Sequence, residues 1–143
     1  MYQKQVLGLE EAEKATKAVI EAATKKKLAL CVAVVDDHGD LVQFTRMNGA
    51  TLAAISNSMN KAYTAAWVRN DTAAYKKSLK ASGDYAPTGD PRRTTVGGGV
   101  CIGRKIEPAT NMRYVLGAVG VGGGIEAEDE MFATIGRDAI GLG

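Results

Sequence analysis

Apolar and polar residues follow one another along this chain in blocks whose spacing predicts the order α-β-β-α-α-β-β-α. Apolar residues recur at helical spacing in the segments 9–27, 51–69, 72–81 and 125–140. Apolar runs typical of strands occupy the segments 28–36, 40–46, 98–103 and 113–121. Because the strands come in consecutive pairs, we predict an α+β fold with an antiparallel sheet flanked by helices.

Two parts of the pattern predict which faces of these elements are buried. In the segment 40–46, Leu41 and Gln43 alternate with Val42 and Phe44, so one face of that strand should be drier. The helix 51–69 carries apolar residues at helical spacing that are predicted to face the core, namely Leu52, Ile55, Met59, Tyr63, Ala66 and Trp67.

Two segments are predicted to lack regular structure. The segment 82–97 is a long loop, because it holds two of the three prolines and three glycines. Loops of this length are usually functional lids, interface arms or mobile. Its Arg92 and Arg93 are interpreted either as lining a ligand entrance or as solvating the loop. The segment 104–111, with Pro108, is predicted to be a connector.

The stretch 113–132 is the best local candidate for a site. An apolar run leads into Gly122, Gly123 and Gly124, and acidic residues then begin the last helix. Free amides at a helix N-terminus can bind an anion, but the acidic residues would repel one. The spacing matches neither a dinucleotide fingerprint nor a P-loop. Since 12 of the 17 glycines lie from Gly97 onward, we favour close backbone packing, between strands or between subunits, over an anion site.

Length and composition predict one globular domain over residues 1–143. The net charge of +2, from 18 basic and 16 acidic residues, argues against nucleic-acid binding. No apolar run approaches the roughly 20 residues that span a bilayer. The segment 1–8 lacks the apolar region of a signal peptide. We therefore expect a cytoplasmic protein without membrane association.

Three residues are weak candidates for binding a cofactor. His38, the only histidine, lies in an acidic predicted turn and is interpreted as solvated rather than as a haem ligand. Cys31 and Cys101 lie in apolar runs. Either thiolate could ligate haem iron, but buried unreactive thiols are favoured. No cysteine or histidine pair has zinc-ligand spacing, so we expect no metal site.

Two basic residues and a methionine are the stronger side-chain candidates. Arg46 ends a predicted strand and Lys61 lies in the second helix. Either could clamp a carboxylate, or form an ordinary salt bridge. Met47 is a soft candidate ligand or a core residue.

Several motifs together resemble the GlcG/HbpS/PduO C-terminal family. They are VVDDHGDLVQFTRMNGA, NKAYTAA, GGGVCIG, LGAVGVGGG and EDEMFA. The resemblance covers nearly the whole chain in the right order, and it is particularly close to the stand-alone OrfY-type proteins of anaerobic glycerol (dha) operons. Asn48 stands where the family usually has Asp, Cys101 where it usually has Pro, and Gly122 where it often has Ser. A ligand contact made by that Asp or Ser in relatives would be altered here.

The resemblance implies a sheet of about five strands, similar to profilin or PAS-type folds, and homo-oligomers from dimers upwards. It favours a non-catalytic protein that binds haem, a corrinoid or another small ligand in glycerol, diol or glycolate metabolism. One alternative is an accessory enzyme for a hydroxy-acid or aldehyde, with Arg46 and Lys61 holding the substrate. Another is a structural module for a cofactor-dependent diol or glycerol dehydratase. The expected ligand-binding residues are Arg46, Met47, Lys61 and the glycines 122–124, with Cys31 and His38 as weaker candidates.

Overall fold

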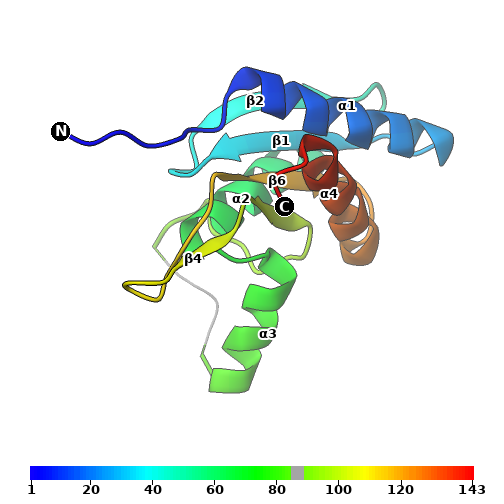
Figure 1. The fold of residues 1–143 in the computed structure, drawn as a ribbon. Coiled ribbons are helices and arrows are strands. Elements are labelled where there is room, and N and C mark those ends of the chain that lie inside the picture. The colour runs from blue at the N-terminus through cyan, green and yellow to red at the C-terminus, as the bar shows by residue number, and fades with distance from the viewer. Residues whose placement is uncertain (85–88) are drawn as a thin grey trace.

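The computed structural model describes residues 1–84 and 89–143. Residues 85–88 of the predicted long loop lie outside the described part. The helices are α1 (Leu9–Lys25), α2 (Leu52–Val68), α3 (Thr72–Ser82) and α4 (Glu126–Ile140). The strands are β1 (Cys31–Asp36), β2 (Leu41–Arg46), β3 (Gly99–Ile102), β4 (Lys105–Glu107), β5 (Met112–Tyr114) and β6 (Gly117–Gly122). The predicted α+β class is confirmed (Figure 1).

Four strands form one antiparallel sheet in the order β2-β1-β6-β3. Its register pairs Cys31 with both Arg46 and Gly122 at one end of the sheet. At the other end, Gly117 pairs with both Asp36 and Ile102. We call these the Arg46 end and the Asp36 end. The turn of the β1–β2 hairpin lies at the Asp36 end.

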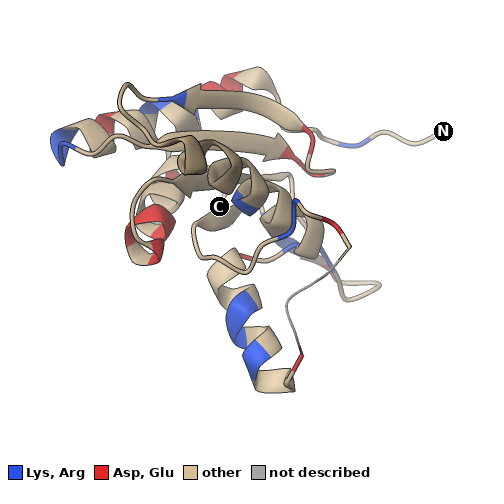
Figure 2. Cartoon of the chain, turned by 180° about the vertical axis from the view of Figure 1, so that it is seen from behind, with Lys and Arg blue, Asp and Glu red and all other residues tan. Residues whose placement is uncertain are grey.

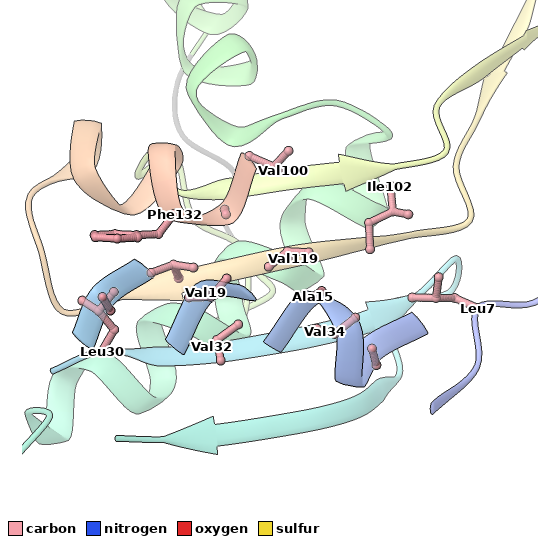
Figure 3. Packing of buried hydrophobic residues seen from close by; sticks show 14 residues of the cluster. Leu7, Ala15, Val19, Leu30, Val32, Val34, Val100, Ile102, Val119 and Phe132 are labelled. Atoms are coloured by element: carbon pink, nitrogen blue, oxygen red, sulfur yellow. The ribbon is translucent and has the colours of Figure 1, made fainter. Parts of the chain in front are cut away.

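Helices cover both faces of this sheet. Alternate side chains of β1 point to opposite faces, so Val32 and Val34 pack toward α1 and α4 while Ala33 and Val35 pack toward α2. Figure 3 shows the first core, in which Val19, Val119 and Phe132 gather between α1, β6 and α4. Phe132 is fully buried.

Helix α2 buries small side chains rather than most of the large ones predicted to face the core. Leu52 is 85% exposed and Trp67 is 54% exposed. Of the predicted set, Tyr63 and Ala66 are buried. The small residues on the buried side are Ala54, Ser58, Ala62, Thr64 and Ala65. The predicted face is therefore correct for Tyr63 and Ala66, and in part for Ile55 and Met59, which pack half-buried against the core, but it is wrong for Leu52 and Trp67. Small residues fill most of the contact because the backbone of α2 lies directly on a glycine-containing strand.

Glycine in β6 permits this close approach. A methyl group on Gly120 would overlap the carbonyl oxygen of Ser58, and one on Gly122 would come within 2.8 Å of the carbonyl oxygen of Ala54. The expected close backbone packing at these glycines is thus found between a strand and a helix of the same chain.

The predicted connector contains a strand. β4 pairs with β5 in a separate two-stranded sheet, with Ile106 opposite Arg113. The predicted strand 113–121 is divided, because the chain leaves this sheet at Tyr114 and enters the main sheet at Gly117. We call residues 105–114 the arm (Figure 1).

A bulge disrupts the alternation predicted for β2. Val34 pairs with Gln43 but Val35 pairs with Leu41, so Val42 is the extra residue. As a result, Val42 packs against the core beneath α1 and α4, whereas Phe44 packs on the α2 side. The prediction of one drier face is wrong for this strand.

Charged residues gather on a few elements (Figure 2). The first turn of α4 is acidic, and α3 carries Lys76, Lys77 and Lys80. The ammonium of Lys76 lies 2.9 Å from the carboxylate of Glu126 and holds the pKa of that group below its usual value. Among the described helices, none has the length and apolar composition needed to cross a membrane.

Candidate functional site

A concave surface lies at the Arg46 end of the sheet, where α1 ends and β2 ends. It is a groove of about 540 Å³. Its walls come from the end of α1, the segment leading to β1 and the end of β2, and the lining residues are Ile20, Thr24, Lys27, Leu28, Ala29, Thr45, Arg46, Met47 and Asn48. We call it the Arg46 groove.

Local backbone geometry shapes this groove. Helix α1 ends where Lys27 adopts a left-handed conformation with φ of 56°. The amide of Leu28 then donates to the carbonyl of Ala23 at 3.0 Å, which closes the helix end. On the facing side, Met47 donates its amide to the carbonyl of Leu30 at 3.0 Å, and Leu30 donates its amide to the Met47 sulfur at 3.4 Å.

The groove is cationic. It presents Lys27 and Arg46, and within the described residues neither forms an ion pair. Residues 85–88 contain no acid that could pair with them. Asn48 also lines the groove and adds no charge to this surface. The arrangement can bind a carboxylate or another anion beside an apolar surface.

Two of the predicted ligand-binding residues, Arg46 and Met47, are therefore brought together in one groove. Sequence reasoning missed Lys27, because the run Lys25–Lys27 has a sufficient local explanation at a helix C-terminus. A lysine in a left-handed conformation just after a helix is visible only in the structure.

The glycine turn lies at the same end of the sheet, where Gly122 is buried, Gly124 is half-buried and Gly123 is exposed. Gly123, with φ of +124°, packs against Leu30 and against the carbonyl of Ala29, a groove residue. The amide of Gly124 donates to Oδ1 of Asp129 at 2.9 Å. The amide that the sequence offered to an external anion is thus bound by a carboxylate of the chain itself.

Lys61 completes this internal arrangement. Its ammonium lies 2.7 Å from Oδ2 of Asp129 and donates to the carbonyl of Val121 at 3.0 Å. The two side chains are 3% and 2% exposed. Lys61 therefore joins α2, β6 and α4 from inside the protein and does not line the Arg46 groove.

The weaker candidates lie apart from the groove surface. Cys31 pairs with Arg46 in the sheet but is fully buried. Burial raises the pKa of its thiol, and the charge of Arg46 partly opposes this shift. Burial likewise raises the pKa of the Cys101 thiol to about 12. Both thiols are buried, as expected. His38 is exposed in the hairpin turn at the opposite end of the sheet.

Arg92 and Arg93 hold the long loop against α2. The guanidinium of Arg92 lies 4.1 Å from the centre of the Tyr63 ring, and that of Arg93 lies 3.8 Å from the Trp67 ring. The Tyr63 hydroxyl donates to Asp90 at 2.7 Å. Arg92 and then this hydroxyl lower the pKa of Asp90 to about 2.

This cluster was only partly foreseen. The sequence placed Arg92 and Arg93 in a loop, without indicating that two aromatic side chains four residues apart on α2 would stack with them. The contacts join residues that are distant in sequence, so no local sequence pattern predicts them. Their effect is to fasten the described part of the loop, residues 89–97, across α2.

Comparison with protein families gives a match over most of the chain. The family model described as haem degrading protein HbpS-like matches residues 7–138. Protein GlcG of Escherichia coli K12 is 32% identical over 121 residues, which are 85% of this chain and 84% of that protein. An uncharacterized 15.0 kDa protein in the dhaT-dhaS intergenic region of Citrobacter freundii is 29% identical over 137 residues, 94% of this chain and 92% of that protein.

A solved structure shows the same fold. The crystal structure of protein ORFY of Klebsiella pneumoniae matches with a TM-score of 0.83 and 28% identity. The match covers 99% of this chain and 94% of that one.

Proposed function

The chain belongs to the HbpS-like family, as its motifs suggested, and from this premise we propose that it is a haem-binding accessory protein that acts as a homo-oligomer. The observation that supports this most directly is the Arg46 groove. It combines an apolar surface with two cations that have no ion-pair partner among the described residues. Setting it in glycerol, diol or glycolate metabolism is part of the proposal and is supported by the similarity to GlcG and to the protein of the dhaT-dhaS region.

The residues of the groove fit the chemistry of a haem. Haem has a flat apolar ring and two carboxylates. Lys27 and Arg46 would hold the carboxylates, and Ile20 and Leu28 would contact the ring. Met47 is the one sulfur-containing residue that lines the groove, and methionine is an axial ligand in some haem proteins. Bound haem would supply a redox-active iron.

The same residues favour haem over a corrinoid. A cobalamin-type corrinoid carries mostly neutral amides and a single anionic phosphate, so it would leave one of the two cations of the groove without an anionic partner. The groove residues also give less support to the accessory-enzyme alternative, because that alternative needs Arg46 and Lys61 to contact one substrate. Lys61 is buried in its ion pair with Asp129.

Assembly into homo-oligomers is supported by an exposed leucine and by the edge strand β2. Leu52, four residues after Asn48, is 85% exposed. β2 is an edge strand of the sheet, and its outer backbone groups are available for contacts with another copy. A second copy at this edge would cover the open side of the groove.

Hemin titration followed by its absorbance tests the proposal. The wild-type chain should give a saturable shift of the main haem absorption band. Arg46→Ala should weaken binding by about tenfold, the effect of losing roughly 1.4 kcal/mol of charge-assisted hydrogen bonding. Met47→Leu should alter the shape of the spectrum more than the affinity, because it keeps the packing but removes the sulfur.

A matched control is Arg137→Ala, which removes an arginine of α4 that lines neither the groove nor the arm, and it should bind hemin as the wild type does. Sedimentation velocity on the same samples measures the assembly. A linear, unsaturable response, or equal weakening in the two arginine variants, would reject the groove as a haem site, and a monomer with and without hemin would reject the homo-oligomer.

A further inference from the structure

A second basic pocket lies where the arm meets the end of α2. It has a volume of about 350 Å³. Its lining residues are Asn70, Arg104, Lys105, Ile106 and Arg113. We call it the arm pocket. It shares no residue with the Arg46 groove and lies at the Asp36 end of the sheet, because Arg104 follows Ile102.

Positive charge is concentrated here without compensation. Arg104, Lys105 and Arg113 line the pocket, and Arg69 donates to the backbone carbonyl of Arg113 at 2.8 Å. None of these four forms an ion pair with any described residue. The undescribed residues 85–88 include no acid.

Carboxylates near the pocket have other partners. Asp37, which lines a neighbouring cavity together with Lys105, lies 2.6 Å from the ammonium of Lys4. Asp71 accepts the amide of Cys101 at 2.9 Å, and Glu107 accepts the amide of Ala109 at 3.2 Å. Mutual repulsion of like charges disfavours such a cluster. The fold nevertheless brings them together, because β4 and β5 pair and hold Arg113 opposite Ile106.

The pocket is also organised by polar contacts. Arg104 donates to Oδ1 of Asn70 at 2.8 Å, which fixes one side of its guanidinium and leaves other donors unused. The side chain of Arg113 makes no hydrogen bond within the described residues, so its full fork is available. Arginine forks bind phosphate and carboxylate groups in bidentate fashion, and Ile106 offers an apolar contact for a carbon skeleton.

We propose that the arm pocket binds a small organic polyanion, that is, a metabolite with several phosphate or carboxylate charges. The volume lies near the lower end of the range for ligand sites, about 300–1,000 Å³, and so suits a metabolite. The charge pattern sets the class of ligand: a neutral ligand would leave the cations unpaired, and a single negative charge would satisfy only one of the forks.

Calorimetric titration with two probes tests this and separates the two sources of charge. Inorganic pyrophosphate represents phosphate groups and citrate represents carboxylates. At least one should bind saturably to the wild-type chain, and the stronger probe identifies the ligand class. Arg113→Gln should weaken that binding by about tenfold, whereas Arg113→Lys, which keeps the charge but loses the fork, should weaken it less.

Controls distinguish a built pocket from general attraction to a basic protein. Lys77→Gln removes one charge from α3, where Lys77 is exposed, and should bind the probe as the wild type does. Because Arg113 is exposed on the arm, its substitution should leave the unfolding transition unchanged. Absence of saturable binding by both probes, or equal weakening by Lys77→Gln and Arg113→Gln, would overturn the proposal.

Discussion

At the scale of single residues, the buried carboxylate of Asp129 binds two groups that the sequence suggested for an external ligand, the amide of the glycine turn and the ammonium of Lys61. Asp129 accepts the amide of Gly124 and pairs with Lys61, and both side chains are almost fully buried. Sequence reasoning named Lys61 and the glycine turn separately as candidates for binding. It could not connect them, because 68 residues separate Lys61 from Asp129.

Asp129→Asn tests how much this buried pair depends on charge. The amide side chain is close in shape to the carboxylate, but it leaves the Lys61 ammonium buried without a counter-charge. We expect a loss of about 3–5 kcal/mol in the free energy of unfolding, measured by urea denaturation. Adding Lys61→Met, which removes the stranded charge, should recover roughly 2 kcal/mol.

The exposed pair of Lys76 and Glu126 provides the comparison. Lys76→Met and Glu126→Gln, alone or together, should each change the free energy of unfolding by less than about 1 kcal/mol. If Asp129→Asn is as mild as these surface variants, or if Lys61→Met worsens it, then the pair is not held together by charge.

At the scale of elements, the packing of α2 on β6 sets the structure of the sheet face opposite α1 and α4. Gly120 and Gly122 bring the helix backbone against the strand, and the helix presents small side chains to it. Trp67 is therefore displaced to an exposed side of α2, where it stacks with Arg93, whereas the buried Tyr63 stacks with Arg92. The packing of α2 on β6 thus positions the aromatic side chains that hold residues 89–97 against the helix.

Gly120→Ala should disrupt this packing. The added methyl group has no room beside the Ser58 carbonyl, so helix and strand must separate. We expect a loss of about 1–3 kcal/mol in the free energy of unfolding. Gly97→Ala is the matched control, since a methyl there would meet Ala73 at an ordinary 3.5 Å, and it should stay within about 0.5 kcal/mol of wild type. Equal stabilities of the two variants would contradict the close-packing explanation.

The sequence predicted elements well where the signal is local. Helices α1 and α4 and strand β1 have strong periodic or continuous apolar patterns, and all three were predicted. The arm was missed because its three-residue strands are too short to show a pattern. The prediction for α2 failed at Leu52 and Trp67 because its partner strand, which requires small residues, is distant in sequence. Arg46 and Met47 are adjacent in sequence and could be predicted together as candidates. Lys27 is distant from them in sequence, so it could not be assigned to their groove.

At the scale of the whole molecule, the chain is nearly neutral but its charges are unevenly distributed. The net charge is only +2, yet Lys27 and Arg46 at one end of the sheet and the arm pocket at the other lack acidic partners in the described chain. Acidic residues gather in the first turn of α4 and in the β1–β2 hairpin, which carries Asp36, Asp37 and Asp40. The two ends are separated by strands of six residues, which correspond to roughly 20 Å.

This separation predicts that the Arg46 groove and the arm pocket bind their ligands independently. Coupling between sites requires an element with two arrangements that both ligands bias, whereas the sheet between these sites is a packed core. Direct repulsion between two bound anions is also weak over this distance, because the screening length is about 8 Å at about 0.15 M salt. Hemin should therefore change the affinity for pyrophosphate by less than about twofold, and pyrophosphate should change that for hemin equally little.

The measurement is a pair of titrations, each made with and without saturation by the other ligand, and thermodynamic reciprocity gives an internal check on the two values. The arginine variants extend it: Arg46→Ala should affect hemin alone, and Arg113→Gln should affect pyrophosphate alone. If hemin and pyrophosphate compete, they share a site and the assignment of two separate ligand surfaces is wrong. If the two ligands are strongly coupled without competing, the sheet between their sites must have a second arrangement. The sheet would then not be the single packed core described above.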